Sequence, residues 1–460
     1  MSKEKTIATI NPTNGKILNR YKYITDKVLQ DAITKCHKAF MIWREVSPEN
    51  RAKVIKAIGK ELMKSKEELS QLMTDEMGKT LEHSRQEIDL CAAICNYTAK
   101  IGPKELKTEE RDMLNGNKGR VSYAPIGVVY GIQPWNYPSY QVVRYSIASL
   151  MGGNGVLLKH ASNVTGSGKL LEQIYQRTDI PDGLFTILII NHDQSDSVIT
   201  NKLVRGVTLT GSPEAGKKIG QKATAALKKS VLELGSNDAY LVFEDADIDL
   251  AVKASVTGRI YNNGETCIAA KRFIVVEKVY DEFREKFVKA MSKVKTGNPN
   301  IKSTQLGPIA REDLRDELHE QVLASVKKGA KIACGGKIPN GEGFFYPATV
   351  LENVKPGQPA YEDEFFGPVA SLIKAKNNKD AMRIANDSRY GLGGGIFSKN
   401  EAAAFEIAEK YFDTGMVFIN SFGLADPAMP FGGVKESGYG REHGGFGLKE
   451  FVNVKSVMKR

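Results

Sequence analysis

Residues 206–226 read GVTLTGSPEAGKKIGQKATAA and contain the repeating unit on which the chain is built. Gly206–Thr210 is rich in β-branched and apolar residues, which is typical of a strand. Gly211 and Ser212 form a turn, and Pro213–Ala226 is expected to be a helix because proline fits the first helical position. A strand that passes through a glycine turn into a helix is one unit of an alternating α/β fold.

The same alternation extends in both directions from this stretch. Strands are expected at 126–132, 155–159 and 185–190, and helices at 140–148, 166–176 and 195–201. A second alternating block covers about 238–420, apolar residues at helical spacing fill roughly 26–100, and Phe451–Val457 is expected to be a further strand. Alternation of this kind predicts parallel sheets that are covered by helices.

Length and composition place the chain among globular proteins with a large core. A chain of 460 residues is expected to form two or three domains, and 41% apolar with 26% charged residues is ordinary for such proteins. No apolar run approaches the ~18 residues that a membrane span needs, so no membrane partner is expected. The net charge of +11 suits nucleic-acid binding, attraction of anionic ligands or a lysine-rich surface. Because no arginine cluster with interleaved aromatics is present, nucleic-acid binding is not expected.

The cysteines indicate a reducing compartment. There are five of them, an odd number, and they are widely spaced, which argues for the cytoplasm and against a disulfide framework. Cys91 and Cys95 are one helical turn apart, but no nearby histidine or cysteine completes a zinc set. We therefore expect both to pack in the core, and we predict no metal site.

Cys267 is the candidate nucleophile. It ends the stretch YNNGETC at 261–267, and Glu233 ends an apolar run 34 residues earlier. A thiolate can attack a carbonyl carbon, and a carboxylate can later take a proton from water, so the two support a covalent mechanism. A single cysteine is also often a small buried hydrophobic residue.

Other polar residues lie where parallel strands are expected to end. Asn136, in the PWNYP stretch at 134–138, follows a strand, and its amide either donates to a developing oxyanion or satisfies the backbone of a turn. The glycine turn at 208–216 can direct backbone N–H groups toward a pyrophosphate. Lys159 and Glu364 are candidates for ribose or phosphate contacts, although a solvated lysine and a surface turn explain them equally well.

Together these stretches resemble the aldehyde dehydrogenase superfamily over nearly the whole chain. The resemblance rests on residues 134–138, 158–159, 209–212 with Gly216, 233–235, 264–267, 364–368 and 430–438. It implies an α/β fold with a Rossmann-like NAD(P)-binding domain, an α/β catalytic domain and a small β oligomerisation arm. The corresponding ranges are 1–113 with 129–235, then 236–436, and 114–128 with 437–460.

The resemblance also implies a role for each site residue. Cys267 would be the nucleophile, Asn136 with the Cys267 backbone N–H would hold the oxyanion, and Glu233 would activate water. The implied cofactor contacts are Gln133 and Trp135 in the channel, Lys159 and Ser162 at the adenosine ribose, Thr210, Gly211, Ser212 and Gly216 at the diphosphate turn, Glu364 at the nicotinamide ribose, and Phe366 beside the nicotinamide.

Three departures from the family pattern bear on chemistry. Ser162 stands where many NAD-preferring members have a glutamate, so we expect NADP to be preferred and NAD to be accepted. Glu265 replaces the usual glutamine, and if ionised it would raise the pKa of the nearby thiol. Ser236 replaces a common glycine and is expected to restrict the backbone near Glu233.

The expected substrate is succinate semialdehyde, oxidised to succinate. Arg144 lies eight residues after Asn136, where succinate-semialdehyde dehydrogenases carry an arginine that faces the distal carboxylate. The alternative role of Arg144 is that of a helix arginine paired with a local carboxylate. Tyr261 stands where one branch has a second arginine, and Tyr140 completes the predicted substrate set.

The chain is most similar to short bacterial-type succinate-semialdehyde dehydrogenases. Oxidation of another small aldehyde, and a CoA-acylating or reductive reaction, remain the alternatives. Exposed strand edges in the arm predict a homodimer or homotetramer.

Overall fold

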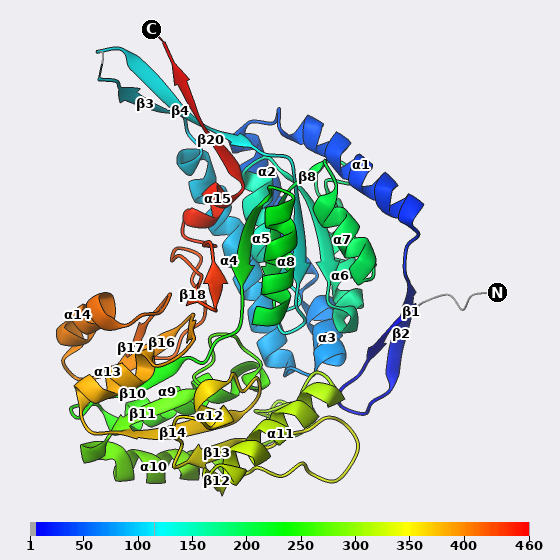
Figure 1. The fold of residues 1–460 in the computed structure, drawn as a ribbon. Helices are drawn as coiled ribbons and strands as arrows, with labels where there is room; N and C mark the ends of the chain where they lie inside the picture. Colours follow the sequence, from blue (N-terminus) through cyan, green and yellow to red (C-terminus); the bar gives the residue numbers. More distant parts are fainter. Residues whose placement is uncertain (1–5, 115, 460) are drawn as a thin grey trace.

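The computed structural model describes residues 6–114 and 116–459, arranged around three main sheets (Figure 1). The predicted ranges 1–113, 114–128 and 437–460 therefore fall partly outside the described residues. Within the described part of the chain, no helix is both long and apolar enough to cross a membrane.

A six-stranded sheet forms the body of the first half of the chain. Its order is β19-β9-β8-β5-β6-β7, and its strands β5 to β9 are parallel. Helices α5, α6, α7 and α8 connect them. The bounds are β5 Val128–Gln133, α5 Tyr140–Met151, β6 Gly155–His160, α6 Thr165–Gln176, β7 Phe185–Ile187, α7 His192–Thr200, β8 Val204–Thr210, α8 Pro213–Ala225, β9 Lys229–Glu233 and β19 Gly438–Tyr439. The alternation predicted from the sequence is thus present, strand by strand and helix by helix.

One of the predicted strands is shorter than expected. The strand expected over 185–190 ends at Ile187, although Leu188 and Ile190 are buried. The Leu188 N–H still donates to the carbonyl of Leu158 at 2.7 Å, while the side chains of Leu188 and Ile190 pack in a cluster that includes residues of α1 (Asp26–Trp43). Burial explains the apolar run, and the run alone does not reveal where strand pairing stops.

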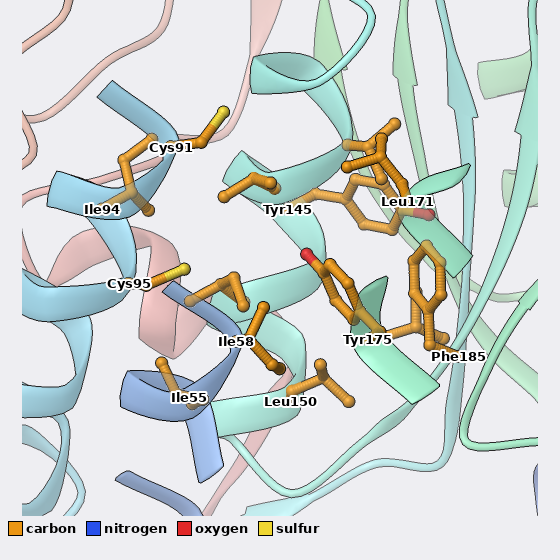
Figure 2. Packing of buried hydrophobic residues seen from close by; sticks show 14 of the residues in the cluster. Ile55, Ile58, Cys91, Ile94, Cys95, Tyr145, Leu150, Leu171, Tyr175 and Phe185 are labelled. Atoms are coloured by element: carbon orange, nitrogen blue, oxygen red, sulfur yellow. The ribbon is translucent and has the colours of Figure 1, made fainter. Parts of the chain in front are cut away.

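The largest core cluster lies between the six-stranded sheet and the amino-terminal helices. Figure 2 shows side chains from α2 (Pro48–Lys64), α4 (Leu81–Glu105), α5 and α6 converging on one another. Cys91 and Cys95 belong to this cluster and are fully buried, as predicted for core residues. Burial of this surface fixes α5, the helix that follows the PWNYP stretch, against the sheet.

A seven-stranded sheet forms the body of the second half. Its order is β12-β13-β14-β11-β10-β16-β17, and its strands are parallel except for β12. Helices α9, α10, α11 and α13 pack around it. The bounds are β10 Ala239–Val242, α9 Ile248–Ile260, β11 Arg272–Val276, α10 Glu277–Met291, α11 Glu312–Lys327, β12 Lys331–Cys334, β13 Thr349–Glu352, β14 Val369–Ala375, α13 Asn378–Asn386, β16 Gly394–Phe397 and β17 Phe418–Ile419.

A three-stranded antiparallel sheet projects from the body at the top of Figure 1. It contains β3 (Glu109–Asp112), β4 (Lys118–Pro125) and β20 (Val452–Met458). Strand β3 lies in the range expected for the cofactor domain, and β19 lies in the range expected for the arm although it pairs with β9. The division into domains remains a prediction.

Buried Asn154 joins this projecting sheet to the six-stranded sheet. Its side-chain oxygen accepts hydrogen bonds from the N–H groups of Ile126 (2.9 Å) and Gly127 (3.1 Å). Its amide nitrogen donates to the carbonyl of Phe451 at 2.8 Å. One side chain therefore ties the start of β5 to the chain segment that enters β20.

Candidate active site

The predicted nucleophile Cys267 follows a turn with left-handed backbone. The short 3-10 helix Tyr261–Gly264 has φ of 53° at Asn262 and 75° at Gly264. Asparagine tolerates this region better than most residues with a Cβ, and glycine adopts it freely. A Cβ on Gly264 would also lie 2.5 Å from the backbone of Gly367. The Asn-Asn-Gly run therefore lets the thiol segment pass against the loop that carries Glu364 and Phe366.

The side chain of Asn262 connects the nucleophile segment with the segment of Asn136. Its amide nitrogen donates to the carbonyls of Asn136 and Glu265, both at 3.0 Å. The Asn136 amide also donates to the Glu265 carbonyl, at 3.1 Å. Because an amide carries two N–H donors, Asn136 keeps one for a ligand while it satisfies the backbone. Asn262 was not predicted to be a site residue from the sequence, in which it stands two residues before Gly264.

A buried ion pair supports the loop that carries Asn136. Glu87 accepts the N–H groups of Ser139 (2.7 Å) and Tyr140 (2.8 Å), at the start of α5. That helix has no side-chain cap of its own, so Glu87 takes over this function from α4. Lys79 pairs with Glu87 at 2.5 Å, and both side chains are fully buried. Glu87 and Lys79 therefore hold the end of the PWNYP stretch in place, although neither residue belongs to the six-stranded sheet.

The predicted base Glu233 ends β9 and is buried. Neither of its carboxylate oxygens has a hydrogen-bond partner among the described residues. Burial raises the pKa of this carboxyl well above its usual range, while Arg144 lowers it and Glu442 raises it further. A Cβ on Gly432 would lie 2.9 Å from a Glu233 oxygen, so glycine at 432 leaves room for the carboxylate. Burial therefore favours the neutral form of Glu233, and only its carboxylate form can accept a proton from water.

The surroundings of Cys267 favour the neutral thiol over the thiolate. Burial raises its pKa to about 12. Arg144 and Lys271 lower the pKa, whereas Glu364 and Asp238 raise it. The nearest cations therefore offset only part of the cost of forming a thiolate.

Buried Lys271 links the nucleophile to a predicted cofactor residue. Its ammonium donates to the carbonyl of Cys267 at 2.5 Å and pairs with Glu364 at 3.2 Å. No role was assigned to Lys271 from the sequence. Lys271 therefore connects Glu364, through an ion pair, to the Cys267 segment, through a hydrogen bond.

Two of the departures noted in the sequence have hydrogen-bond partners in the structure. Glu265 accepts the N–H of Ala310 at 2.9 Å, and burial raises its pKa well above the usual range. Burial therefore favours the neutral form of Glu265, which weakens its opposition to thiolate formation at Cys267. The Ser236 hydroxyl donates to the buried carboxylate of Asp238, so this serine fixes a neighbouring side chain as well as the backbone.

A single pocket gathers many of the predicted residues between the two large sheets. Those that line it are Trp135, Asn136, Thr210, Gly211, Ser212, Cys267, Glu364 and Phe366. The remaining predicted residues, Gln133, Tyr140, Arg144, Lys159, Ser162, Gly216, Glu233 and Tyr261, do not line it. The pocket therefore brings the thiol, an amide donor and the glycine turn onto one surface.

The glycine turn meets the pocket at the amino terminus of α8. Ser212 caps the helix by accepting the N–H of Ala215 at 3.2 Å. Gly211 has no side chain or backbone atom closer than 3.8 Å to the position of a Cβ, which leaves space for a ligand. Gly216 has a packing role instead, because a Cβ there would lie 2.5 Å from Leu234. Space and helix polarity at this turn suit a diphosphate.

Lys159 and Ser162 lie beyond the pocket, at the carboxyl end of β6. Lys159 is partly buried and Ser162 is exposed. His160, between them, contacts the carbonyls of Gln133 (3.2 Å) and Pro138 (2.8 Å) through its two ring nitrogens. The segment is thereby fixed to the PWNYP loop, and Ser162 remains open to solvent.

Arg144 is already paired in this structure. Its guanidinium forms a buried salt bridge with Glu442 and donates to the Thr210 hydroxyl at 3.0 Å. It also lies over the rings of Phe431 (4.6 Å) and Tyr140 (5.2 Å). The carboxylate that pairs with it is distant in sequence rather than local. A direct clamp on a substrate carboxylate would have to compete with Glu442, and that role remains a prediction.

The two predicted substrate tyrosines also have protein partners. The Tyr140 hydroxyl lies 3.0 Å from a ring nitrogen of His443. The Tyr261 hydroxyl donates to Gln86 at 2.9 Å, and its ring lies 4.2 Å from that of His83. Both hydroxyls therefore support neighbouring segments in this structure.

Part of the pocket wall was not anticipated from the sequence. It consists of Gln141 on α5, Leu234 and Gly235 after β9, and Leu314, Glu317, Leu318 and Gln321 on α11. Helix α11 carries no glycine turn or ligand motif, so only the fold reveals that it covers the pocket.

Comparison with known proteins identifies the class. The aldehyde dehydrogenase family model matches residues 1–457, so the chain belongs to the aldehyde dehydrogenase family. The α/β fold that the resemblance implied is therefore confirmed.

Two relatives and one solved structure are similar to this chain over nearly its whole length. The succinate semialdehyde dehydrogenase [NAD(P)+] Sad of Escherichia coli (strain K12) is 42% identical over 451 residues, which are 98% of this chain and 97% of the relative. A succinate-semialdehyde dehydrogenase [NADP(+)] of Deinococcus radiodurans is 39% identical over 454 residues, with 99% and 95% covered. The solved structure of succinic semialdehyde dehydrogenase from Streptococcus pyogenes with NADP+ has a TM-score of 0.96 and 34% identity, covering 98% of this chain and 99% of that one.

The raised thiol pKa predicts how Cys267 reacts in the protein without cofactor. Because the neutral thiol predominates far below a pKa of about 12, we expect alkylation by iodoacetamide to accelerate as pH rises. The rate should increase about tenfold per pH unit between about pH 7 and 10. Peptide mass spectrometry would follow the modification, with Cys267→Ser as the control. A rate that levels off below about pH 9 would contradict this assignment.

Proposed function

We propose that this chain oxidises succinate semialdehyde to succinate through a thioester on Cys267, with NADP⁺ preferred over NAD⁺. The observation that carries the proposal is the pocket in which Cys267, Asn136 and the β8–α8 turn meet. The relatives that are named for this substrate support the choice of aldehyde.

The chain offers a suitable place for the dinucleotide. The amino terminus of α8 and the open turn at Gly211 suit the diphosphate, and Glu364 and Phe366 line the same pocket. When bound, the nicotinamide accepts a hydride from the substrate. We assign Trp135, Thr210 and Ser212 to this cofactor region, with Gln133, Lys159 and Ser162 toward the adenosine end.

The chemistry of the chain's own groups follows from these positions. The Cys267 thiolate attacks the aldehyde carbon and forms a C–S bond, while the Asn136 amide and the Cys267 N–H stabilise the oxyanion. Loss of hydride from that carbon leaves a thioester. Glu233, in its carboxylate form, then takes a proton from water, which attacks the thioester and releases the acid and the thiolate; Glu233 afterwards releases that proton to solvent. In sum, the aldehyde, the oxidised cofactor and water give the acid, the reduced cofactor and a proton.

Initial rates with two aldehydes test this proposal. We expect the reduced cofactor to form faster from succinate semialdehyde than from butanal, and the product to be the free acid even when CoA is present. Cys267→Ala should abolish turnover because no thioester forms, while cofactor binding persists. Faster oxidation of butanal, or normal turnover by the variant, would refute the substrate or the mechanism respectively.

Cofactor preference is tested at Ser162, which is exposed beside Lys159. In Ser162→Glu a carboxylate would repel a 2′-phosphate, and we expect kcat/KM for NADP⁺ to fall about 100-fold while that for NAD⁺ changes little. The exposed Ser197 on α7 provides a matched control, because Ser197→Glu adds the same charge elsewhere. Equal loss with both cofactors would show that residue 162 does not face the phosphate.

We further propose that the chain assembles into a homodimer or homotetramer through its projecting sheet. Strand β20 is an edge strand whose Val454, Val457 and Met458 are exposed, and unpaired edges with apolar residues favour pairing with another chain. Light scattering should give a multiple of the 50.6 kDa chain mass. Val454→Asp combined with Val457→Asp should shift the mass toward the monomer. A wild-type monomer at all concentrations would refute this assembly.

A further inference from the structure

Gln141 carries an unsatisfied amide on the wall of the pocket. It lies in the first turn of α5 and is 1% exposed. Among the described residues, neither its amide oxygen nor its amide nitrogen has a hydrogen-bond partner. Gln141 lines the pocket together with Asn136 and Cys267. A buried amide without partners is unfavourable, and a ligand that supplies a partner relieves that cost.

The position of Gln141 distinguishes it from other buried amides. In the part of the chain that the structure describes, Gln133 and Asn163 are also buried with both amide atoms unpaired. Neither of these two lines the pocket. Among these three side chains, only Gln141 combines an amide without a partner among the described residues with a place in the wall of the pocket that contains Cys267.

Arg144, one helical turn further along α5, is less available for a ligand. Its guanidinium is neutralised by Glu442 and donates to Thr210, and it lies outside the pocket lining. An anionic group in the pocket would have to displace Glu442 to reach it. Gln141, by contrast, has two N–H donors and one acceptor that no group of the described residues uses.

We propose that Gln141 is a specificity-determining residue, whose amide N–H groups bind the carboxylate at the far end of the aldehyde while the aldehyde carbon lies at Cys267. This inference rests on the proposed function, because it assumes a substrate with a distal carboxylate. A site that hydrogen-bonds a polar group of its substrate discriminates strongly against an analogue without that group. Gln141 therefore selects the carboxylated aldehyde over an unsubstituted one of similar length.

Two substitutions test the assignment with the full-length protein and saturating NADP⁺. Gln141→Leu keeps the size but removes the polar atoms, and should lower kcat/KM for succinate semialdehyde by about 10- to 100-fold. The value for butanal should stay unchanged or rise. Gln141→Glu places a negative charge against the substrate carboxylate. Its kcat/KM for succinate semialdehyde should therefore fall further than in Gln141→Leu, whereas its value for butanal should not. Asn163→Leu is the matched control, because it removes another unpaired buried amide away from the pocket.

A second measurement needs no turnover. Succinate should protect Cys267 of the wild type from iodoacetamide, butyrate should protect it less, and Gln141→Leu should lose the advantage of succinate. Thermal unfolding and fluorescence titration with NADPH would show that fold and cofactor affinity persist in the variant.

The outcomes separate this inference from the proposed function. If the wild type prefers succinate semialdehyde and Gln141→Leu keeps that preference, Gln141 is not the determinant although the function stands. Equal losses of kcat/KM with both aldehydes, or weaker NADPH binding, would show that Gln141 supports the fold or cofactor binding and does not select the substrate. If the wild type shows no preference and succinate gives no protection, both the proposed substrate and this inference fail.

Discussion

The amide of Asn262 donates hydrogen bonds to two loops that come from different sheets, and the position of both predicted reacting groups depends on that contact. Asn136 follows a strand of the six-stranded sheet, whereas Cys267 follows a helix of the seven-stranded sheet. Neither sheet by itself fixes the distance between them. The left-handed backbone at Asn262 directs its side chain toward both loops, so a strained turn provides the connection that the sheets lack.

Buried ion pairs hold the surrounding segments in place. Arg144 with Glu442 and Lys271 with Glu364 join segments that are far apart in the sequence, whereas Lys79 with Glu87 joins α4 to the segment just before it. Taking such charges out of water is costly, so these pairs contribute little net stability compared with apolar packing. Removal of one partner leaves an uncompensated buried charge, which typically costs about 3–5 kcal/mol.

The sequence predicted most of the fold, because the alternation of strand and helix patterns is local. The turn at Gly211 and Ser212 and the helix that starts at Pro213 illustrate this, since their signals lie within a few residues. The shortened strand β7 shows the limit, because buried apolar residues look alike whether or not they pair. For the site, the sequence indicated the thiol, the amide donor and the glycine turn. The partner of Arg144, the α11 wall and the unpaired Gln141 depend on tertiary contacts, so they could not be predicted from local patterns.

Three residues between 432 and 451 contact buried side chains that come from much earlier in the chain. Gly432 lies against the Glu233 carboxylate, Glu442 neutralises Arg144, and the Phe451 carbonyl holds Asn154 at the start of β5. All three contacts come from residues 432–451, which follow every strand of the seven-stranded sheet along the chain. The parallel strands β5 to β9 can therefore pair before the residues that face Glu233 and neutralise Arg144 are present. A chain truncated before residue 432 would carry the Cys267 thiol without these contacts.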